Sequence, residues 1–91
     1  MPRRIKLSSR YKKSYRRLEK RGNDMEKLHC VIEMLCRGEV LPVKYRNHPL
    51  KGNWNGHMEC HLGPDWLLIY QLSDEHVFLV ESGTHSDLFD K

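Results

Sequence analysis

The periodicity of the apolar residues changes once along this chain, and the change limits the folds open to it. Over residues 9–36 apolar side chains recur every three or four residues, the spacing of two amphipathic helices separated at Gly22. Over residues 57–82 the chain instead contains three strand-like runs joined by short polar links. A helical hairpin followed by an antiparallel meander indicates an α+β fold.

The first predicted helix has clear signals at both ends. Ile5 and Leu7 alternate with basic residues, which indicates a short strand just before it. Ser8 or Ser9 can then cap the helix, and the helical pattern runs to about Arg21. One apolar stripe is expected to face the core, and it consists of Tyr11, Tyr15 and Leu18.

The second predicted helix opens at Asn23 or Asp24 and closes at Gly38. Glu26 stands three residues after Asn23, the spacing of a capping box. The buried face is expected to hold Met25, Leu28, Val31, Ile32 and Leu35. Because the link between the helices is short, we expect an antiparallel hairpin that packs on one face of the sheet.

Three strand-like runs follow, at about 57–62, 66–72 and 76–82, with a helical turn at 86–89. Alternation along the first run gives a polar face of His57, Glu59 and His61 and an apolar face of Met58, Cys60 and Leu62. The apolar face should pack on the helices. The polar face is then expected to point to solvent on the open side of the sheet.

Positive charge is concentrated near the N-terminus. The 91 residues, expected to form one domain over 1–91, carry sixteen Lys and Arg against twelve Asp and Glu, a net charge of +4. Ten of these basic residues lie within the first 21, where Glu19 is the only acid. Such an arm suits RNA or another polyanion, although a solvated helix face explains it equally well. The candidate residues for binding such a polyanion are Arg10, Lys12, Lys13, Arg16, Arg17, Lys20 and Lys51.

The sequence favours a cytoplasmic protein with no membrane partner. No apolar run approaches the roughly 20 residues that cross a bilayer, and the basic N-terminus lacks the apolar core of a signal peptide. The three cysteines, Cys30, Cys36 and Cys60, are odd in number and include no C-x-x-C pair. A reducing compartment suits them better than a disulfide framework.

Histidines gather in the second half of the chain. The segment HPLKGNWNGHMECHLGPDW begins at His48 and holds three of the six, and His85 follows near the end. Structure, metal binding and proton transfer are the three explanations. A structural zinc site needs four converging ligands, whereas Cys60 points away from His57 and His61 on their strand. We therefore expect no metal and no cofactor.

Three segments, HPLKGNW, ECHLGPDWLLIY and SGTHSDLF, follow the helical hairpin in this order. Together they resemble the YafQ-like branch of the RelE/ParE toxin superfamily, and the resemblance extends from the first strand to Phe89. It implies a RelE-like fold and the toxin of a bacterial type II toxin–antitoxin system. The implied activity is that of a ribosome-dependent endoribonuclease, or mRNA interferase, that cleaves mRNA in the ribosomal A site and inhibits translation. The implied partners are the ribosome, mRNA and an acidic, ribbon-helix-helix-like antitoxin, whose complex with the toxin binds operator DNA.

The resemblance also assigns a catalytic set: His48 of HPL, His61 of ECH, Asp65 of PDW, His85 of GTH and Phe89 of the closing LF. Imidazole can act as acid or base near neutral pH, so these histidines can cleave RNA without a metal. The expected products are a 2′,3′-cyclic phosphate and a 5′-hydroxyl. Trp54 and Trp66 are expected to be packing residues, and Asp65 alone could simply be a turn residue.

Two positions depart from the family pattern. Relatives commonly carry an arginine just before the E-C-H step and another four residues before the last histidine, where this chain has Met58 and Glu81. A carboxylate at the second position would repel the scissile phosphate. The alternative functions are therefore a weakened or inactive toxin that only binds its antitoxin, or a gyrase-directed toxin of the ParE type.

Overall fold

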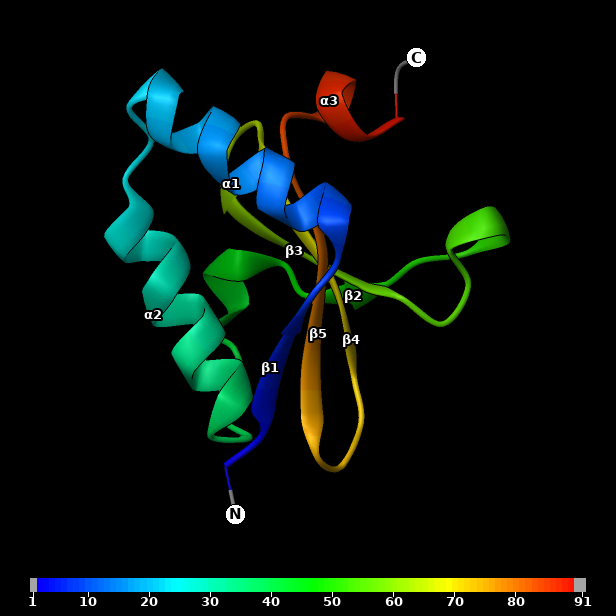
Figure 1. Cartoon of the computed structure of the whole chain (residues 1–91). Helices are drawn as coiled ribbons and strands as arrows, with labels where there is room; N and C mark the ends of the chain where they lie inside the picture. Colours follow the sequence, from blue (N-terminus) through cyan, green and yellow to red (C-terminus); the bar gives the residue numbers. More distant parts are fainter. Residues whose placement is uncertain (1, 90–91) are drawn as a thin grey trace.

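The computed structural model describes residues 2–89 as a five-stranded sheet with two helices across one face (Figure 1). The elements in chain order are β1 (Arg4–Leu7), α1 (Ser9–Arg21), α2 (Met25–Cys36), η1 (Val43–Tyr45), β2 (His48–Pro49), η2 (Gly52–Trp54), β3 (Met58–Gly63), β4 (Trp66–Leu72), β5 (His76–Gly83) and α3 (His85–Phe89). The expected α+β fold is confirmed, and the three strands of the meander lie where alternation placed them.

The sheet has the strand order β1-β5-β4-β3-β2. The chain leaves β1, crosses one face through α1 and α2, forms β2 at the far edge, and returns strand by strand to β5. β1 therefore pairs in parallel with β5, while all other neighbours are antiparallel. The sheet is mixed, a difference from the expected antiparallel arrangement that arises because β1 precedes the helical crossover.

The caps of α1 agree with the sequence, and α2 starts after Asp24, one of its two predicted openings, but without the predicted capping box. The Ser8 hydroxyl accepts a hydrogen bond from the backbone N–H of Tyr11 at 2.9 Å, as an N-cap does. The expected capping box between Asn23 and Glu26 is wrong, because Asp24 is the N-cap and makes no side-chain hydrogen bond. Asn23 belongs instead to the end of α1, where its backbone N–H donates to the Leu18 carbonyl.

The main core lies between the helices and the sheet. Its fully buried side chains include Leu18 of α1, Leu28 and Val31 of α2, and Cys60 and Tyr70 of the sheet. Cys60 thus lies on the helix-covered face, as alternation predicted. Among the predicted α2 positions only Met25 remains partly exposed.

The opposite face is not open to solvent, and that expectation is wrong. A second cluster of Leu67, Ile69 and Leu88 fills it, with Leu50 and Trp54 packed against the cluster. The covering segments are the loop around η2 and the C-terminal helix α3, which both fold back over the sheet. As a result Glu59, which points to this face, is only 5% exposed.

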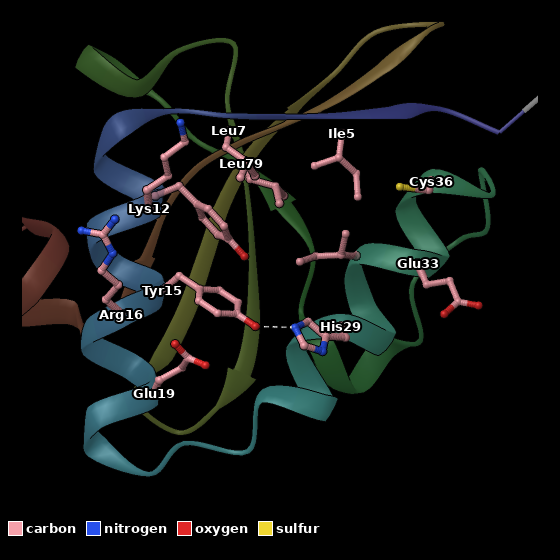
Figure 2. A pocket seen from close by; sticks show the side chains of 12 residues that line it. Ile5, Leu7, Lys12, Tyr15, Arg16, Glu19, His29, Glu33, Cys36 and Leu79 are labelled. Carbon is pink, nitrogen blue, oxygen red and sulfur yellow. Dashed lines mark hydrogen bonds between the residues drawn. The ribbon is translucent and has the colours of Figure 1, made fainter.

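The two helices diverge after Gly22 and leave an apolar groove of about 730 Å³ between them (Figure 2). Ile5 and Leu7 of β1 line it and stay 51% and 44% exposed, although their partners Val77 and Leu79 are buried. The Tyr15 hydroxyl and Nε2 of His29 meet across the groove at 2.7 Å. The short link predicted between the two helices is thus confirmed, but the helices do not pack against each other along their length.

None of the helices among residues 2–89 has the length and apolar character needed to cross a bilayer.

Candidate active site

The site lies on the sheet face opposite α1 and α2, at the end where β2, β3 and α3 meet. His48 on β2 stands opposite Glu59 on β3 in the strand register, and His61 follows two residues later on the same face. Asp65 lies in the turn between β3 and β4, and His85 is the first residue of α3. The structure thus gathers four of the predicted catalytic residues from four separate segments.

Glu59 is the member that sequence reasoning left out of the site. Its Oε1 accepts a hydrogen bond from Nε2 of His48 at 3.0 Å and lies 3.3 Å from Nε2 of His61, within ion-pair distance. If His61 donates through Nε2, its Nδ1 keeps a free lone pair. The sequence signal for this role was the spacing of two residues between Glu59 and His61, which puts both side chains on one face of β3. Its burial depends on chain segments far away and was not visible in the sequence.

Asp65 holds His85 in two ways. Its Oδ1 accepts hydrogen bonds from the His85 backbone N–H at 2.8 Å and from the ring Nδ1–H at 2.6 Å. These hydrogen bonds, the backbone one foremost, hold the pKa of the Asp65 carboxyl below its ordinary value. Asp65 is therefore more than a turn residue, since it fixes the ring and leaves Nε2 of His85 free.

The three imidazoles form a row. Ring centroids are 5.8 Å apart for His48 and His61 and 6.2 Å apart for His61 and His85. Burial lowers the pKa of His61, assisted by the positive charges of Arg46, His48 and His85, although Glu59 acts in the opposite direction. His61 is therefore suited to be neutral at pH 7, with a lone pair available beside the carboxylate-bound His85.

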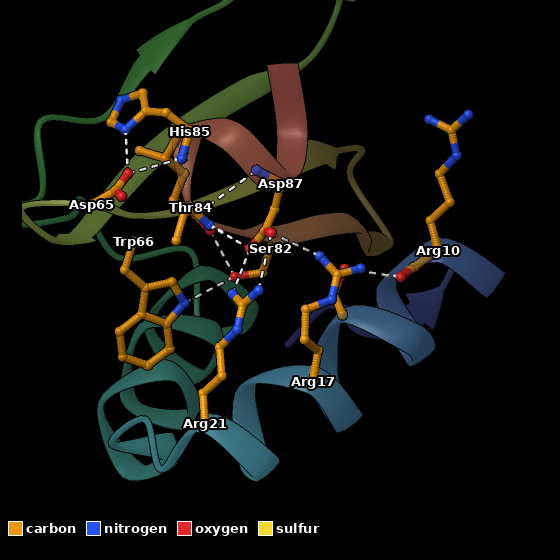
Figure 3. A network of polar contacts seen from close by, with 11 residues as sticks. Arg10, Arg17, Arg21, Asp65, Trp66, Ser82, Thr84, His85 and Asp87 are labelled. Carbon is orange, nitrogen blue, oxygen red and sulfur yellow. Dashed lines mark hydrogen bonds and ion pairs between the residues drawn. The ribbon is translucent and has the colours of Figure 1, made fainter. Parts of the chain in front are cut away.

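A third carboxylate, Asp87, anchors the helix that carries His85 (Figure 3). Arg21 donates to both of its oxygens at 2.6 and 3.1 Å, and Arg17 lies 3.1 Å away. Asp87 also accepts from the Thr84 backbone N–H, while its own N–H donates to the Thr84 hydroxyl, which closes a capping box at the start of α3. The hydrogen bonds from Arg21 chiefly hold the pKa of Asp87 far below its ordinary range. The T-H-S-D spacing was the sequence signal for this cap.

The predicted RNA-binding residues do not share one face. Lys12 and Arg16 line the groove, and Arg17 is paired with Asp87. Arg10 reaches to the other side of the sheet, where its Nη1 lies 3.8 Å from Oε1 of Glu81. The remaining members of the set are exposed, and they are Lys13, Lys20 and Lys51.

The two departures from the family pattern lie in different places. Met58 packs against the main core, on the face away from the histidines. Glu81 is on the histidine face, but Ile69 separates it from Glu59 across the sheet, two strand spacings or roughly 10 Å away. Phe89 is 44% exposed and meets Trp54 edge to face at 6.1 Å, one turn along α3 from His85.

Three donor groups can hold a metal ion. The ligand atoms of His48, Glu59 and His61 lie within 4.8 Å of one another. This set differs from the His57, Cys60 and His61 combination weighed from sequence, since Cys60 lies on the other face. Two imidazoles and a carboxylate suit copper or zinc.

Comparisons with known proteins agree on one family. Residues 3–90 match the model of the bacterial toxin of type II toxin–antitoxin system, YafQ. The mRNA interferase toxin YafQ of Escherichia coli K12 is 40% identical over 86 residues, which are 93% of this chain and 94% of that protein.

Solved structures give the same result. YafQ in the E. coli DinJ–YafQ toxin–antitoxin complex superimposes with a TM-score of 0.90 at 39% identity, over 98% of this chain and 99% of that one. A metal-bound toxin from Helicobacter pylori gives a TM-score of 0.89 at 41% identity, over 98% of this chain and all of that one. The chain therefore belongs to the YafQ family of bacterial type II toxin–antitoxin toxins.

Proposed function

We propose that this toxin is an endoribonuclease that cleaves mRNA on the ribosome by metal-independent acid–base chemistry. The observation that carries the proposal is the row of three imidazoles, each in contact with a carboxylate. His48 and His61 contact Glu59, and His85 contacts Asp65. The E. coli relative named an mRNA interferase supports the substrate. The gathered histidines and carboxylates favour an active enzyme over an inactive or gyrase-directed one.

In the proposed reaction His61 acts as the base, because its lowered pKa keeps it neutral and Glu59 fixes its ring. His61 takes the proton of the 2′-hydroxyl, and the 2′-oxygen forms a bond to phosphorus. The bond from phosphorus to the 5′-oxygen breaks, and His85 gives that oxygen a proton. The products are a 2′,3′-cyclic phosphate and a 5′-hydroxyl. Asp65 stabilises the His85 imidazolium before the transfer, and His48 adds positive charge when protonated.

Primer extension on translated transcripts tests the proposal. Expression of the toxin should arrest growth and give cuts inside codons, and His85→Gln should abolish both. His76→Gln on the far end of β5 is the matched control and should cut normally. Intact messages together with altered DNA supercoiling would replace the ribonuclease proposal with the gyrase-directed one.

The proposed ribosome contact uses the exposed basic residues Lys13, Lys20 and Lys51, with Lys12 and Arg16 beside them. Phosphate contacts weaken steeply with salt, so Lys13→Glu with Lys20→Glu should lower ribosome association most at low ionic strength. Arg37→Glu at the C-cap of α2 is the control, since Arg37 pairs with the nearby carboxylates of Glu33 and Glu39. Equal binding across a salt series would assign these lysines to a solvated helix face.

The proposed antitoxin contact is the groove between α1 and α2. E. coli YafQ is described in complex with DinJ, which supports an antitoxin as the partner. The groove offers apolar walls, the basic side chains Lys12 and Arg16, and the unpaired edge of β1 beside Ile5 and Leu7. An acidic, amphipathic segment complements these features, and the resulting complex would bind operator DNA through the antitoxin.

Co-expression with the antitoxin of the adjacent gene tests this contact. Leu7→Glu should prevent rescue of growth while cleavage continues. Val40→Glu is the control, because Val40 is 93% exposed outside the groove. Rescue of the Leu7→Glu variant would place the antitoxin elsewhere.

A further inference from the structure

A hollow beside the histidine row has walls that suit one nucleotide. It measures about 470 Å³ and lies between the start of α1, η2 and α3. Its walls carry one cation, one amide, one imidazole, one leucine and two large aromatic rings, from Arg10, Asn53, His57, Leu88, Trp54 and Phe89. The family motifs assign Phe89 to the catalytic set but give no role to Asn53 or Trp54. They also do not explain why Arg10 lies at this hollow, away from the other basic residues of α1.

The aromatic wall presents ring surface to solvent. Phe89 is 44% exposed, so much of its ring is open to a ligand in the hollow. Trp54 meets Phe89 edge to face at 6.1 Å and His57 at 5.3 Å, so its indole is fixed by contacts on both sides. Fixed aromatic rings are the usual stacking platforms for unpaired bases. Trp54, expected from sequence only to pack, therefore has a second use.

The cation of the hollow, Arg10, lies near one carboxylate, that of Glu81. Arg10 is 61% exposed at its side chain, and its Nη1 lies 3.8 Å from a Glu81 carboxylate that is only 12% exposed. A guanidinium has five N–H donors, and one distant carboxylate oxygen leaves most of them available. Arg10 thus lies at the rim of the hollow and close enough to Glu81 to offset part of its negative charge.

We propose that this hollow binds the nucleotide next to the scissile bond, with the base on Phe89 and Trp54 and a phosphate on Arg10. His85 and Phe89 are four residues apart on α3, a rise of about 6 Å, which places the hollow beside the reacting centre. Asn53 supplies a donor and an acceptor for the base edge. This inference rests on the proposed function, because it names how that enzyme holds its RNA.

Binding of a fluorescent 2′-O-methyl hexaribonucleotide, measured by anisotropy, tests the inference. Its 2′-oxygens carry no proton, so it cannot be cleaved and binding is read apart from chemistry. Trp54→Ala should weaken binding by about 5–150-fold, the range for one stacked base, whereas Trp54→Phe should keep most of it. Arg10→Ala should reduce the slope of log affinity against log salt by about 0.7, the value for one phosphate on a single strand.

Matched variants separate this result from a loss of fold. Arg37→Ala removes an exposed arginine that also pairs with a glutamate, and it should change neither affinity nor slope. Thermal melts of each variant check that the second core cluster remains intact. Arg10→Ala and Trp54→Ala proteins that bind like the parent would overturn the proposal, as would a parent that fails to bind at about 10⁻⁴ M.

The outcome also distinguishes this inference from the proposed function. Weakened binding by the variants in a protein that never cleaves RNA would keep the hollow as an RNA site and reject the enzyme. Normal cleavage efficiency in both variants, with the parent active, would keep the enzyme and reject the hollow.

Discussion

One carboxylate oxygen of Asp65 accepts hydrogen bonds from both the backbone and the ring of His85. Replacement by asparagine keeps the shape but removes the charge that stabilises the His85 imidazolium. We expect Asp65→Asn to lower the rate of cleavage by about 10²-fold with little change in substrate binding. Single-turnover assays on programmed ribosomes measure both quantities.

The control for this variant is Asp74→Asn in the exposed β4–β5 turn, which should cut at the parental rate. An Asp65→Asn enzyme of full activity would contradict the role of Asp65 and leave it as a turn residue.

His61 should set the acidic limb of the pH–rate profile. The base must be neutral, so activity rises as pH increases through the pKa of His61, which burial lowers below its ordinary value of about 6.5. Glu59 opposes this shift, so Glu59→Gln should move the limb to still lower pH while also loosening the ring. A limb that moves to higher pH in Glu59→Gln would show that another group titrates.

The ion pair of Arg10 and Glu81 predicts a charge-swap result. Arg10→Glu alone sets two carboxylates side by side near the RNA, and cleavage should fall by about tenfold or more. Adding Glu81→Arg restores one cation at the same place and should recover most of the loss. Glu81→Arg alone should raise cleavage and toxicity, because it adds a cation without removing one. Equal activity in all three variants would mean that no phosphate approaches this pair.

The limits of prediction from sequence follow from the range of the interactions involved. The N-cap at Ser8 was predicted because it depends on residues three positions away. The burial of Glu59 was not, since it depends on η2 and α3, which fold over the sheet from elsewhere in the chain. The capping box between Asn23 and Glu26 fails because the Asn23 backbone closes α1, and of the two predicted openings of α2 only Asp24 remains. The sequence motifs identified the histidines of the site. Their arrangement in a row depends on the register between β2 and β3, which the sequence does not specify.

Asp87 predicts a pH-dependent loss of stability. Its pKa is depressed in the folded protein, so its contribution is present above the unfolded value of about 3.9 and is lost as pH falls below it. Asp87→Asn should therefore cost about 1–3 kcal/mol at pH 7, and the difference from the parent should shrink below about pH 4. Urea unfolding at several pH values measures it.

Glu33→Gln serves as the comparison, because the Glu33–Arg37 pair is exposed and is expected to contribute less than about 1 kcal/mol. The Asp87→Asn enzyme should also cleave more slowly, since α3 carries His85. A pH-independent difference in stability would assign the effect to packing.

The three donor groups of His48, Glu59 and His61 predict inhibition by metal rather than activation. An ion bound beside Glu59 takes Nε2 of His61, so the proton of the neutral ring moves to Nδ1 and blocks the lone pair that His61 needs as a base. Cu²⁺ should inhibit more strongly than Zn²⁺, following their order of affinity. EDTA should leave cleavage unchanged or restore it. His48→Gln should weaken the inhibition, whereas Cys30→Ser, which removes an exposed thiol outside the site, should not. Loss of cleavage in EDTA with recovery on adding zinc would instead make the metal part of the reaction.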